Sequence, residues 1–144
     1  MLEYATFLGD NGEDMGRGVA IDGEGKVYVT GGTASADFPV TADALDSTLG
    51  GDRDAFLVIF SSGGCGPLYA SFLGGSARDE AYAVAFNPTG LYLTGLTFSA
   101  DFPTSEGSYD TSHNGDYDVY VTAYTMSDEP PPLTCRLHLP AVIR

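Results

Sequence analysis

The chain has 144 residues and a formal net charge of −14 at pH 7, from 20 acidic and 6 basic residues. This charge argues against nucleic acid or an anionic membrane as a partner, because both require a positive protein surface. Its 19 glycines predict many turns, and its 12% aromatic residues predict a packed core. No apolar run reaches the roughly 18 residues that a membrane-spanning helix needs.

The first predicted strand lies within residues 2–9 and contains the sequence YATFLG, from Tyr4 to Gly9. The same pattern returns as YASFLG at Tyr69–Gly74, where it closes a repeat unit. We therefore expect the N-terminal strand to complete the sheet of another unit, in the manner of a clasp. Leu137–Ile143 are the alternative source of that strand, although Pro140 makes a poor member of a sheet ladder.

Four strands are predicted in the unit that follows. Gly18–Asp22 and Lys26–Thr33 are short, rich in β-branched residues and joined by a glycine turn, so they predict a hairpin. Asp54–Phe60 is a continuous apolar run of strand length, which is typical of a strand buried on both faces. Leu68–Gly74 is the fourth strand. No segment has a sustained helical period, and the predicted class is all-β.

The second unit repeats the first at an offset of 65 and then 64 residues, because Lys26 has no counterpart. Four short antiparallel strands per unit, with sheets covered on both faces, are typical of β-propeller blades. We expect two four-stranded blades in an incomplete ring, at about residues 10–74 and 75–127, within residues 1–127. Residues 128–144 are expected to form a proline-rich linker and a C-terminal tail.

Motifs across both units resemble the bacterial β-propeller repeat family called SBBP. The matching stretches are YATFLG, GKVYVTGGT, SADFP and GGDRDAFLV, and the resemblance covers residues 3 to about 125. It implies a propeller fold and an exported or cell-surface setting in bacteria, but no single activity. The second unit departs from the pattern at DVYVTAY and at Asn87–Pro88, in ways that suit strands and turns.

The sequence SADFP occurs twice, at Ser35–Pro39 and Ser99–Pro103, just after the second strand of each unit. The structural interpretation is an aspartate that bonds its own downstream backbone, a phenylalanine packed between blades, and a proline that ends the segment. The alternative is a ligand-binding ledge repeated on each blade. Long loops follow each motif, and long loops in compact domains are often functional. The candidate ligand-binding residues are Asp37, Phe38, Asp101, Phe102, Tyr109 and Tyr117.

Calcium is a possible ligand of the acidic turns, because it binds loops that supply several oxygen atoms. The turn DNGED offers Asp10, Asn11, Glu13 and Asp14, but its spacing differs from the DxDxDG calcium loop, and the second unit keeps only the aspartate at Asp79. Two further pairs recur in both units and enter a strand. The alternative role for all of them is turn capping. These pairs are Asp52 with Asp54 and Asp116 with Asp118.

The sequence predicts a non-catalytic scaffold or binding module for protein or glycan contact, without a required cofactor. Its two histidines have no matching partners in the other unit, and the common hydrolase motifs are absent. The preferred interpretation is the C-terminal part of a larger propeller. The alternatives are a two-blade lectin-like protomer that forms a closed ring with identical chains, and a fragment of a propeller hydrolase. Cys65 and Cys135 could form one disulfide in an oxidising compartment.

Overall fold

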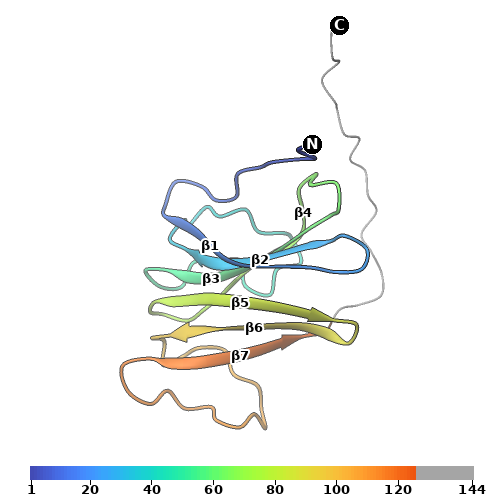
Figure 1. Cartoon of the computed structure of the whole chain (residues 1–144). Coiled ribbons are helices and arrows are strands. Elements are labelled where there is room, and N and C mark those ends of the chain that lie inside the picture. Colours follow the sequence, from blue (N-terminus) through green and yellow to red (C-terminus); the bar gives the residue numbers. More distant parts are fainter. Residues whose placement is uncertain (126–144) are drawn as a thin grey trace, which may run out of the picture.

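The computed structural model describes residues 1–125, which form two stacked antiparallel β-sheets (Figure 1). Blade 1 has the strand order β1-β2-β3-β4, and blade 2 has the order β5-β6-β7. The predicted all-β class, with propeller-type repeats and no closed ring, is confirmed. The strands are β1 (Asp14–Ile21), β2 (Val27–Thr33), β3 (Asp54–Phe60), β4 (Pro67–Leu73), β5 (Asp79–Asn87), β6 (Gly90–Thr97) and β7 (Asp118–Tyr124).

The first strand of each blade begins earlier than the sequence predicts. A β-bulge interrupts the alternating pattern near its start, so the residues before the bulge do not have a recognisable strand pattern. The pairing register shifts between Gly16 and Gly18 in β1, and between Ala81 and Ala83 in β5. Arg17 and Tyr82 are therefore the extra residues of two equivalent bulges, and such bulges bend a strand and redirect a side chain. The residues before each bulge still belong to the strand.

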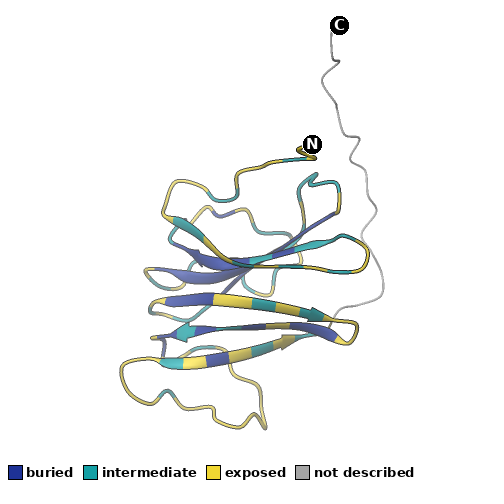
Figure 2. Cartoon of the chain, in the orientation of Figure 1, coloured by how far each residue is buried: buried dark blue, intermediate teal, exposed yellow. Residues whose placement is uncertain are grey.

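Strand β3 is buried along its whole length, as its apolar sequence predicts (Figure 2). Ala55, Leu57 and Ile59 lie in the core between the two blades. Phe56, Val58 and Phe60 lie in a second core on the other face of blade 1. Strand period explains the division, because successive side chains point to opposite faces of a sheet.

The inter-blade core joins blade 1 to blade 2 face to face. Tyr28 stacks on Phe86 with ring centroids 5.3 Å apart, and Leu91, Leu93 and Tyr120 come from the facing sheet. A Cβ added at Gly18 would lie 3.1 Å from the Ala83 Cα, so the inner strands β1 and β5 approach closely. Small residues on these strands permit that approach, as expected for strands near a propeller axis.

Residues 2–9 form no strand in the structure, in contrast to the prediction for this segment. Figure 1 places the N-terminal segment at the end of the stack opposite β7, where residues 2–9 pair with neither edge strand of blade 1, β1 or β4. A β-strand needs a neighbour to satisfy its backbone groups, which explains the irregular conformation here. The expected tail at residues 128–144, with the alternative strand Leu137–Ile143, lies outside the described residues.

Candidate functional site

The serine of the repeated SADFP motif forms hydrogen bonds at the start of the first strand of each blade. In blade 1, the Ser35 hydroxyl donates to Asp14 Oδ2 at 2.9 Å, and Thr33 Oγ1 donates to Asp14 Oδ1 at 2.5 Å. The Ser35 hydroxyl also accepts from the Gly12 amide at 2.8 Å. The same atoms thus connect the incoming turn, the first strand and the segment after the second strand.

Blade 2 contains the same arrangement with residues 64 or 65 positions later. Ser99 Oγ donates to Asp79 Oδ2 at 2.7 Å and accepts from the Ala77 amide at 2.9 Å. The Ser99 amide donates to Thr97 Oγ1 at 3.0 Å. Because Asp79, Thr97 and Ser99 are all buried, this network is structural in both blades.

The aspartates of the motif do not bond their own downstream backbone. Asp37 Oδ2 accepts from the Asn11 side-chain amide at 2.5 Å, and Asp101 Oδ1 accepts from the Ser76 amide at 2.8 Å. These hydrogen bonds lower the pKa of both carboxyl groups. The predicted local Asx turn is therefore wrong, because both carboxyl groups accept hydrogen bonds from the connection that leads into the blade.

The phenylalanines of the motif pack on the third strand of their own blade. Phe38 lies 4.8 Å from Phe56 and 5.8 Å from Phe72, measured between ring centroids. Phe102 stacks on Tyr120 at 4.5 Å and packs against the inter-blade core, as predicted. Phe38 packs in the second core, on the face of blade 1 that is turned away from blade 2.

Two buried carboxyl groups meet at the crossing from blade 1 to blade 2. A Cβ added at Gly74 would lie 2.8 Å from Asp54 Cγ and 2.8 Å from Asp79 Oδ2. Burial raises the pKa of Asp54 to about 6; hydrogen bonds from Gly50 and Gly51 oppose that rise, and the charge of Asp79 adds to it. Asp54 therefore takes up a proton at a higher pH than an ordinary aspartate does.

A cluster of three arginines and two glutamates lies at one end of the same junction. Glu80 is 3% exposed, and it contacts Arg78 at 2.5 Å, Arg17 at 3.5 Å and Arg53 at 3.7 Å. Arg53 also contacts Glu13 at 2.5 Å. Burial alone would raise the pKa of Glu80, but the hydrogen bonds and charges of the arginines outweigh it, and the pKa is lowered.

The sequence analysis missed this cluster, although the sequence contains a signal for it. Three of the six basic residues of an acidic chain converge here. Their repeat equivalents differ in character: Arg17 corresponds to Tyr82, and Arg53 corresponds to Tyr117. The two arginines contact Glu80 of blade 2, whereas within residues 1–125 no third blade lies beside the equivalent tyrosines of blade 2. The difference in residue type therefore follows the difference in neighbours.

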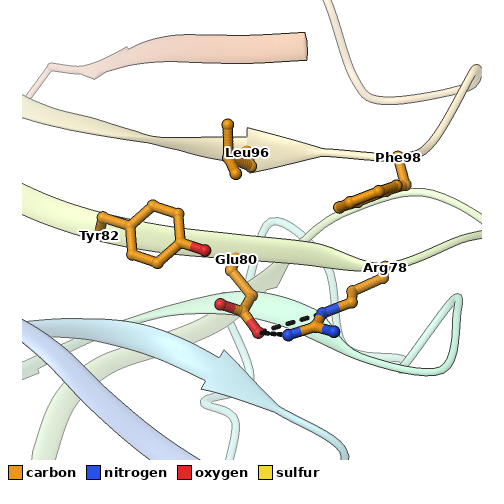
Figure 3. Close-up of a pocket in the computed structure, with 5 residues that line it drawn as sticks. All are labelled: Arg78, Glu80, Tyr82, Leu96 and Phe98. Atoms are coloured by element: carbon orange, nitrogen blue, oxygen red, sulfur yellow. Dashed lines mark hydrogen bonds and ion pairs between the residues drawn. The ribbon is translucent and has the colours of Figure 1, made fainter. Parts of the chain in front are cut away.

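A small pocket of about 160 Å³ lies on the open side of the cluster (Figure 3). Figure 3 shows Arg78 and Glu80 joined along one wall, with the rings of Tyr82 and Phe98 on either side of Leu96. Arg17 lies over the Tyr82 ring at 5.5 Å, a cation–π contact. Phe98 also packs against Tyr117 at 5.4 Å, so the pocket opens onto an aromatic surface.

The two long loops hold the remaining predicted ligand-binding residues. Tyr109 is fully exposed and Tyr117 is half-exposed, both in the connection between β6 and β7. Leu45 takes the position of Tyr109 in the first loop and is also exposed. In each loop an aspartate closes a turn near this residue, because the Thr48 and Ser112 amides donate to Asp46 and Asp110.

The residues considered for calcium take part in the hydrogen bonds and ion pairs of the fold. Asn11, Glu13 and Asp14 bond to partners in blade 1, as described, and the Asp10 amide donates to Asp14 Oδ2. The Asn114 amide donates to Asp118, as the Gly50 amide does to Asp54. Asp52 and Asp116 are exposed. Within residues 1–125, no group of three or more histidine, cysteine, aspartate or glutamate side chains could hold a metal ion.

Comparison with known families assigns the repeat. The SBBP beta-propeller repeat matches residues 3–39, which run from the N-terminal segment through β1 and β2 to the end of the first SADFP motif. This match confirms the predicted resemblance to the SBBP repeat within residues 3–39. No curated protein matches the chain.

Two observations concern membranes and disulfides. Among residues 1–125, no helix is long and apolar enough to cross a membrane. Cys135 lies outside the described residues, and its pairing with Cys65 stays a prediction.

Proposed function

We propose that this chain is a non-catalytic β-propeller module that contacts a protein or a glycan through its long loops. The observation that carries the proposal is the equivalent exposure of Leu45 and Tyr109. Both side chains are exposed to solvent at the same position of the repeat, so the two long loops present an apolar group at equivalent points. Loops positioned by a rigid scaffold are common binding surfaces.

The chemistry around Tyr109 suits a ligand with both apolar and hydrogen-bonding groups. Its ring offers a flat apolar face, and its hydroxyl can donate or accept a hydrogen bond. Glu106 and Asp110 add carboxylate acceptors nearby in the sequence. The Ser112 amide and hydroxyl donate to Asp110 at 2.9 and 2.7 Å, which orders the turn beside Tyr109 before any ligand arrives.

The proposal assigns no catalytic residue and no metal. The aspartates that recur in both blades hold turns and strand ends together, which accounts for their repetition. We propose an exported or cell-surface location, on the basis of the resemblance to bacterial propeller repeats. Binding is then expected to be the same in calcium and in EDTA.

A glycan array with the full chain, followed by binding assays on any hit, tests this proposal. Tyr109→Ala should weaken binding about tenfold, since an interface anchor contributes about 1.4 kcal/mol or more. Tyr109→Phe, which keeps the ring, should retain most of the affinity. Elution by free sugar would identify a lectin-like module, and a protein partner captured from cell-surface extracts in a Tyr109-dependent way would identify a scaffold. Binding that is unchanged in Tyr109→Ala would contradict the proposal.

A further inference from the structure

Within residues 1–125, blade 2 has no counterpart of the fourth strand of blade 1. In blade 1, β3 pairs with β4, whereas the equivalent strand β7 has a partner on one side only. Val119 and Val121 on β7 are exposed, and Val121 is 74% exposed. An edge with free backbone groups and apolar side chains is a template for another strand.

The N-terminal segment has the sequence of the missing strand. Five of the six residues at Tyr4–Gly9 are identical to those at Tyr69–Gly74, which include most of β4. Yet Phe7 is 104% exposed, while its equivalent Phe72 is 0% exposed. Phe7 is therefore exposed at a repeat position where the equivalent phenylalanine is part of a hydrophobic core.

The turn after this segment already has the conformation of a crossing between blades. The Asp10 amide donates to Asp14 Oδ2 at 2.9 Å, and the equivalent Gly75 amide donates to Asp79 Oδ2 at 2.8 Å. Residues 74–79 carry the chain from β4 of one blade to β5 of the next. Residues 9–14 repeat that connection, so residues 4–9 are placed to serve a blade that precedes blade 1.

Blade 2 also lacks one ring of an aromatic group. In blade 1, Phe38 packs against both Phe56 and Phe72. In blade 2, Phe102 and Tyr120 occupy the first two positions, and no residue of the three-stranded sheet occupies the third. By the repeat, the residue that belongs there is Phe7.

The open face of blade 2 is matched to blade 1 rather than to a copy of blade 2. At the internal junction, Glu80 enters beside Gly32 and contacts Arg17 and Arg53. On the open face of blade 2, the repeat equivalents of Gly32, Arg17 and Arg53 are, in that order, Leu96, Tyr82 and Tyr117. The residue of blade 1 that is equivalent to Glu80 is Met15. The two arginines of the internal junction correspond to tyrosines on the open face, and the glutamate that they contact corresponds to a methionine. The open face of blade 2 and the outer face of blade 1 therefore match each other in their apolar character.

We propose that Tyr4–Gly9 of a second copy of this chain forms the fourth strand of blade 2, with blade 1 of that copy packed on the open face. The register of β3 with β4 then places Phe7 opposite Tyr120 and Thr6 opposite Val121. The strand comes from another chain because the N-terminal segment and β7 lie at opposite ends of the stack (Figure 1). In this arrangement, Met15 of the second copy fills the pocket beside Leu96. The loops that carry Leu45 and Tyr109 stay accessible to a ligand.

Light scattering on a sizing column, with the full chain at about 0.15 M ionic strength, tests the proposal. The expected result is one discrete assembly of about two to four copies, since propellers have roughly four to eight blades. Val121→Lys should convert it to monomer, because the charge would be buried against the donated strand. Leu45→Lys makes the same change at another exposed apolar residue and should keep the assembly. A wild-type monomer, or a mixture without a discrete mass, would overturn the proposal.

A second pair of variants identifies the donor strand. Phe7→Asp should dissociate the assembly without unfolding the monomer, because Phe7 makes no core contact in the isolated chain. Leu45→Asp, at an exposed apolar residue outside the donated segment, should leave the mass unchanged. If the assembly persists in Phe7→Asp, another segment covers β7, and the assignment of residues 4–9 is wrong. These results are independent of glycan or protein binding, and each proposal can therefore fail alone.

Discussion

Serine–aspartate pairs explain why one pentapeptide occurs twice. Each pair ties three segments together at the entrance of a blade, and its hydroxyl both donates and accepts a hydrogen bond. Removing a buried partner leaves the remaining polar groups unsatisfied, which costs more than the net value of the bond. The motif is therefore retained for folding, while the ligand contact proposed above uses other residues.

Ser99→Ala tests the structural role of the motif. We expect it to lower the free energy of unfolding by about 1 to 3 kcal/mol, because Asp79 loses a donor and the Ala77 amide loses its acceptor. Ser112→Ala removes an exposed serine–aspartate hydrogen bond and should cost less than about 0.5 kcal/mol. Urea unfolding of both variants makes the comparison, and equal effects would refute a buried structural role.

The raised pKa of Asp54 predicts a pH dependence of stability. Its folded pKa is about 6, above the value of roughly 3.9 of an unfolded aspartate. The folded state therefore binds the extra proton, and its stabilising effect is complete below about pH 4 and is lost as the pH rises through 6. Between pH 5 and 7.5 the wild-type protein should become less stable as the pH increases.

Replacement of this carboxyl group gives the matching experiment. Asp54→Asn should flatten the stability profile between pH 5 and 7.5, as measured by urea unfolding at several pH values. The repeat-equivalent change Asp118→Asn lies at the free edge of the stack and should keep the wild-type slope. A slope that survives in Asp54→Asn would mean that another group titrates in this range.

At the scale of elements, sequence patterns predict strands well but not their partners. The apolar run of β3 and the alternation of β2 follow directly from residue types, and the structure confirms these strands. Residues 4–9 share five of six residues with Tyr69–Gly74, which include most of β4, yet residues 2–9 form no strand. Pairing depends on a neighbouring edge, and an edge supplied by another chain leaves no trace in local sequence.

The Arg–Glu cluster shows a second limit of sequence analysis. Arg17 and Glu80 are 63 positions apart and meet only because two bulged strands stack. Neither the hydrophobic period of a strand nor the spacing of motifs predicts a contact between side chains of two different sheets. The repeat comparison was informative at SADFP because its partners lie in the same blade, whereas partners across the junction differ between repeats.

Glu80→Gln tests the energetic weight of this cluster. We expect a loss of about 2 kcal/mol in unfolding free energy, because Arg78 loses a charged hydrogen-bond acceptor and Arg17 and Arg53 lose an ion-pair partner in a largely buried site. Glu24→Gln makes the same chemical change in an exposed ion pair with Lys26 and should have an effect below about 0.5 kcal/mol. Thermal unfolding at low and high salt should show the difference, and an equally small effect at Glu80 would contradict the assigned role.

At the scale of the whole molecule, the two blades are similar in construction and different in their surroundings. Blade 1 packs on blade 2 through one face, and Phe38, Val40 and Leu49 of its own long connection pack against part of the other face. Blade 2 is covered on one face only, and its free face carries the pocket and the exposed valines of β7. A large exposed apolar surface next to a free strand edge marks an interaction site. Among residues 1–125, the sheet of blade 2 therefore ends in a free edge at β7.

Hydrogen–deuterium exchange of residues 4–9 tests the central claim most directly, because it reports whether the N-terminal segment is a paired strand. In the native full-length protein, the amides of residues 4–9 should be protected to an extent similar to those of β4. The same amides should exchange rapidly in Val121→Lys, whose β7 edge cannot accept the strand. Free exchange of residues 4–9 in the native wild-type protein would contradict the account.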